Sequence, residues 1–272
     1  MSKTKKFQKM NFLDAVNKLI KYYNEREFSK VIGLYENIFK KLGIDEDKLM
    51  TRDVLPEVYT YVANSYVELG YYNRALQILN SLNLKYMEEE YEDLFYIIVA
   101  CFHQIYMYKN NFEKELEYAE KLIELNPKSS DNYFCRGFAY LNLKKYEAAE
   151  KDLLYALKRK DSLEVYLNLI DLYMTTHRFK EALKYINKGY RKYKRRPGEF
   201  LLLYVKIAVL IKLKDYTNLS KTLEDIYSVV PDNKPEYKIA LLRIEGKDYS
   251  EVYDIVYNQF LKLIEDPRKE SS

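Results

Sequence analysis

Aromatic residues recur along the chain, each after a short polar turn and at the start of a segment with helical apolar periodicity. They are Phe28, Tyr72, Phe112, Tyr146, Phe179, Tyr216 and Tyr249. From Phe112 onward the interval settles near about 34 residues, a period typical of stacked helical hairpins that each contact only their neighbours. The pattern therefore predicts an extended array of paired helices.

The segment 130–160 shows this pattern most clearly. Large and small residues share one face of each of its two expected helices. They are Tyr133, Gly137 and Tyr140 in the first helix, and Tyr146, Ala149, Leu153 and Ala156 in the second. The small residues let the helices approach closely, and the large ones fill the gaps around them. This arrangement resembles the tetratricopeptide repeat, whose consensus has small residues in those columns and aromatic residues beside them.

The resemblance implies an all-α fold, a right-handed α-solenoid of about seven stacked helix-turn-helix repeats, several of them degenerate. We expect a basic N-terminal tail at 1–11, a single solenoid over 12–268 and a short tail at 269–272. The repeat units are expected near 12–45, 56–89, 96–128, 130–161, 163–196, 200–232 and 234–266. An unusually long connection around 87–93 is expected to extend a helix or a loop between units.

When the repeat units are aligned, two polar residues fall in positions, or columns, where the unit 130–160 has small residues. His103 lies in the column of the first helix and Glu115 in that of the second. We interpret His103 as a packed core residue rather than a ligand, and we expect Glu115 to alter the helix crossing angle but not the architecture. His177, in a turn, is expected to be solvated. Two histidines in different units form no metal-binding constellation.

The resemblance also implies where a partner would bind, because the first helices of successive tetratricopeptide units line the concave face. On this sequence the expected groove contains Tyr61, Asn64, Cys101, Gln104, Tyr108, Phe134, Phe138, Leu141, Asn168, Asp171 and Tyr204. Its middle is apolar, and contiguous exposed apolar surface marks an interaction site. We predict that it binds a protein or peptide partner as a helical or extended segment with apolar anchors. The alternative is a groove filled by the chain itself.

Two further surfaces carry hypotheses. An apolar stripe in the last expected helix favours homodimerisation or docking to another subunit, and it consists of Tyr253, Tyr257, Leu261 and Ile264. The segment 188–196 is a basic cluster whose cations include Arg191, Lys192, Lys194, Arg195 and Arg196. Cations near a helix C-terminus are favoured by the helix dipole. Binding of RNA or an anionic surface through this cluster is the alternative function, although the neighbouring units lack the series of matching repeats that RNA reading requires.

Composition narrows the class of protein. The chain has 48% hydrophobic and 32% charged residues with only 7 Gly and 6 Pro, which favours helix nearly throughout. The net charge of +4 does not by itself indicate nucleic acid. The N-terminal segment has no continuous apolar run, so we expect neither a signal peptide nor a membrane span.

Two cysteines form no disulfide framework, and the sequence contains no catalytic motif. We therefore expect a cytoplasmic, non-catalytic scaffold or adaptor protein, without a cofactor or a metal.

Overall fold

The structure is a computed structural model that describes residues 12–39, 55–196, 198–215, 217–219, 221, 222 and 225. All regular structure in these residues is helical. The helices are α2 (Phe12–Asn24), α3 (Phe28–Leu34), the π-helical segment η1 (Tyr35–Phe39), α5 (Leu55–Glu68), α6 (Tyr72–Ser81), α7 (Leu84–Glu90), α8 (Glu92–Tyr108), α9 (Phe112–Leu125), α10 (Ser130–Asn142), α11 (Tyr146–Arg159), α12 (Leu163–Thr175), α13 (Phe179–Tyr193) and α14 (Glu199–Lys212).

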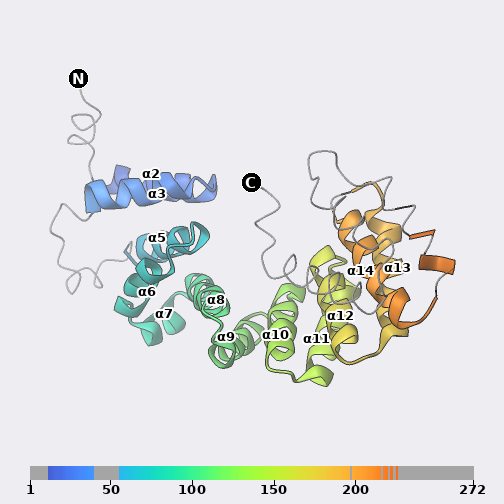
Figure 1. Cartoon of the computed structure of the whole chain (residues 1–272). Coiled ribbons are helices and arrows are strands. Elements are labelled where there is room, and N and C mark those ends of the chain that lie inside the picture. Colours follow the sequence, from blue (N-terminus) through green and yellow to red (C-terminus); the bar gives the residue numbers. More distant parts are fainter. Residues whose placement is uncertain are drawn as a thin grey trace. The chain divides into compact units, whose positions relative to one another are not determined.

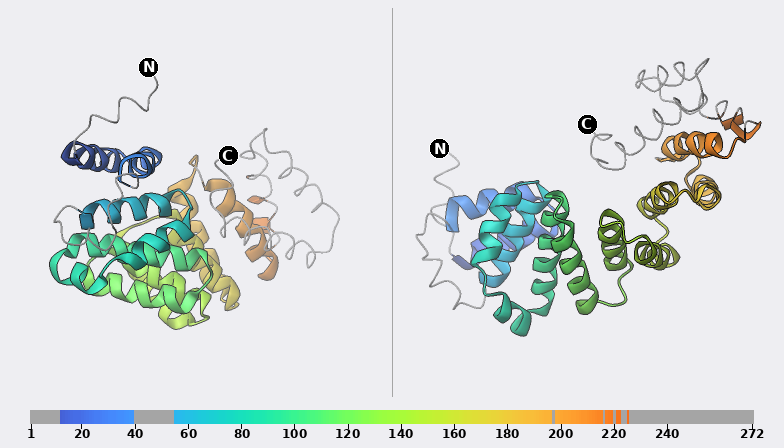
Figure 2. Two further views of the ribbon diagram at one scale, coloured as in Figure 1. Left: turned by 90° about the vertical axis from the view of Figure 1, so that its left-hand side faces the viewer. Right: turned by 60° about the horizontal axis from the view of Figure 1, so that its bottom comes forward.

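The helices form antiparallel pairs that stack within two compact units (Figures 1 and 2). Unit 1 is Met1–Asn132 and contains the pairs α2/α3, α5/α6 and α8/α9. Unit 2 is Tyr133–Ser272 and contains α11, the pair α12/α13, α14 and most of α10. Each unit has its own buried apolar core. The all-α repeat architecture expected from the sequence is confirmed.

The recurring aromatic residues mark the second helix of each pair, as predicted. Helices α3, α6, α9, α11 and α13 begin at Phe28, Tyr72, Phe112, Tyr146 and Phe179. The corresponding Tyr216 and Tyr249 lie outside the described residues. The long connection around 87–93 contains a separate short helix, α7, whose N-terminus is capped by the side chain of Asn83.

The turn inside each pair repeats one backbone geometry. Two residues before each aromatic residue the chain enters the left-handed region, at Arg26, Gly70, Asn110, Lys144 and His177. The next amide N–H bonds back across the last helical turn, as Lys145 does to Tyr140 O at 2.9 Å and Arg178 to Tyr173 O at 2.7 Å. This is the Schellman helix ending, in which glycine is the usual left-handed residue. In the turns named here, only Gly70 follows that preference.

Glycine at two of these positions is expected to stabilise the protein. In Lys144→Gly and His177→Gly variants the left-handed strain of a Cβ residue disappears, while the unfolded chain gains entropy. The net gain should be roughly 0.5–1 kcal/mol per site, read from urea unfolding. The matched control is Lys145→Gly, because Lys145 has a φ of −87°. That control should lower stability, and equal effects at Lys144 and Lys145 would contradict the argument.

Candidate functional site

In unit 1, four side chains on the first helices of the three pairs form one contact network. The ring of Tyr23 on α2 stacks on Tyr61 of α5, with ring centroids 4.0 Å apart and an interplanar angle of 11°. The Tyr23 hydroxyl donates to Asn64 Oδ1 at 2.9 Å. The Asn64 amide donates to Cys101 Sγ on α8 at 3.4 Å. The network therefore links α2, α5 and α8.

This network is electrically neutral near pH 7. Burial raises the pKa of the Cys101 thiol to about 12 and that of Tyr61 to about 12. It also raises the pKa of Tyr23 well above its ordinary range. A protonated thiol is a poor nucleophile. The network is suited to holding helices together and not to covalent chemistry at Cys101.

The other residues expected in the groove of unit 1 differ in accessibility. Tyr61, Asn64 and Gln104 are half-buried, whereas Cys101 is in the core. Tyr108 is 53% exposed and is the last residue of α8, next to the turn that leads into α9. Tyr108 therefore lies at the edge of unit 1 that carries the turns between the first and second helices of the pairs, which we call the turn edge.

In unit 2, two phenylalanines occupy successive turns of α10. Phe134 and Phe138 are half-buried, and their ring centroids lie 6.5 Å apart. Asn168 on α12 is also half-buried, and its amide donates to Glu164 O at 2.8 Å. Asp171, one turn further along α12, is half-buried too. These four residues give unit 2 an aromatic pair on one helix and a polar pair on another.

Two other residues expected on the groove surface are core residues of unit 2. Leu141 is 9% exposed and Tyr204 is 1% exposed. Tyr204 belongs to α14, which is apolar around nearly its whole circumference, and such a helix is buried on all sides. Like Cys101 in unit 1, these two side chains pack into the core of their unit and present little surface to a ligand.

The basic cluster lies at the C-terminal end of α13, where the helix dipole favours cations. Arg191, Lys194, Arg195 and Arg196 are exposed. Lys192 instead forms an ion pair with Asp161, Nζ to Oδ2 at 2.8 Å. The apolar stripe Tyr253, Tyr257, Leu261 and Ile264 falls outside the described residues and stays a prediction.

A buried polar pair joins α8 to α9. His103 Nε2 lies 3.7 Å from Glu115 Oε1, and both residues are buried. Neither His103 Nε2 nor either carboxyl oxygen of Glu115 has a hydrogen-bond partner in the described part of the chain. Burial lowers the pKa of His103 to about 4 and raises that of Glu115 to about 8. Near pH 7 the pair is therefore neutral, and it is packed as the sequence predicted for His103.

Three general features of the described residues bear on function. No group of three or more His, Cys, Asp or Glu side chains among them is placed to hold a metal ion. None of their helices is long and apolar enough to cross a membrane. Neither Cys101 nor Cys135 forms a disulfide bond.

Comparison with known proteins agrees with this architecture. Tetratricopeptide-repeat family models match residues 118–151 and 104–129. A tetratricopeptide repeat protein from Parabacteroides merdae ATCC 43184 has 15% identity and a TM-score of 0.60, covering 90% of this chain and 98% of its own. MamA of MSR-1 has 19% identity and a TM-score of 0.52, covering 66% of this chain and 94% of its own.

These structures share the fold, and at such identities the likeness extends no further. No curated protein matches the sequence. The chain therefore contains tetratricopeptide repeats, which the family models match over residues 104–151, within a stack of helical hairpins.

Proposed function

We propose that the protein is a non-catalytic scaffold that binds a segment of a partner protein on the faces formed by its first helices. The observation that carries the proposal is the half-exposed pair Phe134 and Phe138 on α10 of a tetratricopeptide-repeat protein. Repeat solenoids use such faces as extended binding surfaces. Aromatic side chains in a partly apolar surface are the usual anchors of protein interfaces.

Polar residues beside these anchors would set the specificity of binding. Gln104, Asn168 and Asp171 are half-buried and have surface left for a ligand. Asn64 is also one of the expected groove residues, but its side-chain amide group already bonds Tyr23 and Cys101. Asn64 therefore supports the proposed site mainly by fixing the spacing of α2, α5 and α8.

The scaffold proposal agrees with the state of the reactive side chains. The Cys101 thiol is buried and its raised pKa keeps it protonated. His103 is buried and neutral near pH 7. Neither group has the access and the proton affinity that a nucleophile or a general base needs.

Removing one aromatic anchor is expected to weaken partner binding about tenfold or more, since an interface anchor is worth at least one to two kcal/mol. A pull-down from lysate with the intact chain and with a Phe134→Glu, Phe138→Glu variant would identify proteins lost only from the variant. Calorimetric titration of such a partner against Phe138→Ala then measures the loss. Lys151→Glu on the exposed face of α11 is the matched control and should bind as the wild type does. Unchanged affinity in Phe138→Ala would refute the site.

The second candidate is binding of RNA or an anionic surface through α13. It rests on the exposed cations Arg191, Lys194, Arg195 and Arg196. Phosphate contacts release counterions, so such binding falls steeply with salt concentration, whereas binding by aromatic anchors changes little. The salt dependence of the captured partner's affinity therefore separates the two candidates.

A further inference from the structure

Three of the four large apolar side chains that the described residues of unit 1 expose lie in one place. Tyr71 is 58% exposed, Tyr108 is 53% exposed and Leu69 is 40% exposed. All three lie at the turn between α5 and α6 or at the end of α8, so they share the turn edge of unit 1. Clustered exposed apolar groups, unlike scattered ones, mark an interaction surface.

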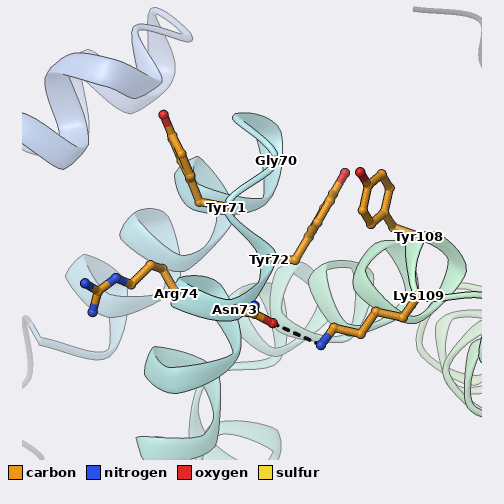
Figure 3. A pocket seen from close by; sticks show the side chains of 7 residues that line it. All are labelled: Gly70, Tyr71, Tyr72, Asn73, Arg74, Tyr108 and Lys109. Carbon is orange, nitrogen blue, oxygen red and sulfur yellow. Dashed lines mark hydrogen bonds between the residues drawn. The ribbon is translucent and has the colours of Figure 1, made fainter.

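A cavity of about 480 Å³ opens at this turn edge. Figure 3 shows the rings of Tyr72 and Tyr108 facing each other on one side of Gly70, with Tyr71 on the other side. Tyr72 and Tyr108 have ring centroids 4.1 Å apart. Space above Gly70 is open, because a Cβ there would meet no atom within 4 Å. An apolar or aromatic side chain of a partner has room between these walls.

The charges of the cavity favour an acidic partner. Arg74 and Lys109 line it, with Lys109 pointing toward Asn73 and Arg74 away from it, and no carboxylate is among its lining residues (Figure 3). Lys109 Nζ donates to Asn73 Oδ1 at 3.1 Å, and Arg74 Nη1 donates to Gln77 Oε1 at 3.3 Å. Both of these acceptors are neutral amides, so neither bond neutralises the cation. The cavity is therefore a tyrosine-lined site with two cations among its lining residues.

A matching acidic and aromatic surface lies on α7 of the same unit. Tyr86 is 38% exposed, and Glu88, Glu89 and Glu90 follow it with exposed carboxylates. Glu88 already pairs with Lys121 at 2.8 Å, and Glu89 lies 3.8 Å from Lys85 in an exposed pair. Together with Leu69, Tyr71 and Tyr108, Tyr86 completes the set of large apolar side chains that the described residues expose.

The two surfaces of one molecule cannot meet. Helix α8 has 17 residues and runs from the α7 side of unit 1 to the turn edge. A helix of that length spans about 25 Å. An occupant with the chemistry of α7 must therefore come from a second molecule.

We propose that the protein self-associates head to tail, with α7 of one copy docking at the turn edge of the next. Tyr86 enters the tyrosine-lined cavity, while Glu89 and Glu90 approach Arg74 and Lys109. Two different surfaces meet in this contact, so the interface is heterologous and each copy leaves one free surface at each end. Association is therefore open-ended and rises with protein concentration, and salt weakens it because the paired charges are exposed.

Sedimentation equilibrium of the full chain at low ionic strength, over increasing protein concentration, tests the proposal. The wild type should increase steadily in weight-average mass. An Arg74→Glu, Lys109→Glu variant lacks the basic surface, and a Glu89→Lys, Glu90→Lys variant lacks the acidic one. Each alone should remain monomeric. Mixed together they should associate, because the intact α7 of the first variant fits the intact turn edge of the second and their two reversed surfaces are also opposite in charge.

Circular dichroism and thermal unfolding show whether both variants keep the wild-type fold. Tyr71→Ala, Tyr108→Ala should also abolish association without changing charge. Arg195→Glu, Arg196→Glu on α13 is the charge-matched control and should associate as the wild type does. A wild type that stays monomeric throughout, or two folded charge variants that fail to associate when mixed, would overturn the proposal. A synthetic acidic peptide filling the cavity of a monomeric wild type would assign the site to another protein instead.

Discussion

Replacing Asp152 by alanine is expected to lower the free energy of unfolding by about 2–3 kcal/mol, because it removes the carboxylate that pairs with a partly buried arginine. Asp152 on α11 is 2% exposed. It accepts two bonds from Arg136 on α10, at 2.6 Å from Nε and 3.0 Å from Nη2. The Arg136 side chain retains 24% exposure, which limits its desolvation and places the effect below that of a fully buried pair. Urea unfolding of Asp152→Ala measures the loss.

The control replaces both partners at once. Arg136→Met, Asp152→Leu leaves no unpaired charge, and apolar pairs of similar volume are often as stable as the ion pair they replace. The double variant should therefore be much closer to the wild type than Asp152→Ala. If Asp152→Ala unfolds within about 0.5 kcal/mol of the wild type, the pair is of the weak surface kind.

The equivalent positions of the preceding hairpin join their two helices by an aromatic contact instead of an ion pair. One period of about 34 residues earlier in the chain, Phe102 and Tyr118 stand where Arg136 and Asp152 stand later. Their rings stack with centroids 4.9 Å apart. An ion pair and an aromatic stack thus occupy one structural position. Residue type alone does not identify such a contact, because either solution joins the two helices.

The architecture could be predicted from the sequence because the role of each repeating residue depends on its spacing from nearby residues in the chain. Phe112 and Tyr146 each follow a polar turn, and each is the first residue of the second helix of its pair. Gly137 is small because a Cβ there would lie 3.0 Å from Leu153 Cγ. Such positions depend on one hairpin only, and a single sequence contains all the information they need.

Features that depend on neighbouring elements were harder to predict. Leu141 and Tyr204 were placed on the groove surface by their column, yet they are buried. Their burial depends on how adjacent helices pack, which a repeat pattern does not specify. The left-handed residues Arg26 and Lys144 have no sequence preference for that conformation and are held there by the hairpin.

The contact between His103 and Glu115 could have been predicted from a signal in the sequence. Both depart from the small-residue pattern, and both do so in the same hairpin. At the position where Leu153 crowds Gly137 in the next hairpin, this hairpin has Ala119, which leaves room for the imidazole. Simultaneous departures in facing columns are therefore evidence of a compensating contact and not of degeneration.

The neutral pair makes the stability of the protein depend on pH in a specific way. Because the pKa of Glu115 rises from 4.5 to about 8 on folding, folding takes up a proton between those values and stability falls as pH rises. Because the pKa of His103 falls from 6.5 to about 4, folding releases a proton there and stability rises with pH. The two effects cancel between pH 4.5 and 6.5 and leave only the loss from Glu115 above pH 6.5.

Glu115→Gln is expected to remove that loss, since the amide does not titrate. Relative to this variant, the wild type should lose about 2 kcal/mol of unfolding free energy between pH 6.5 and 8, at 1.36 kcal/mol per pKa unit. In the variant His103 is no longer offset, so its stability should rise from pH 4.5 to 6.5 where the wild type gains little.

Urea unfolding of both proteins at closely spaced pH values gives the difference curve, in which the other titrating groups cancel. Glu124→Gln, at an exposed position on α9, is the matched control and should follow the wild type. A difference curve that is flat between pH 6.5 and 8 would contradict the prediction, because the folded pair would then hold no proton that the unfolded chain lacks.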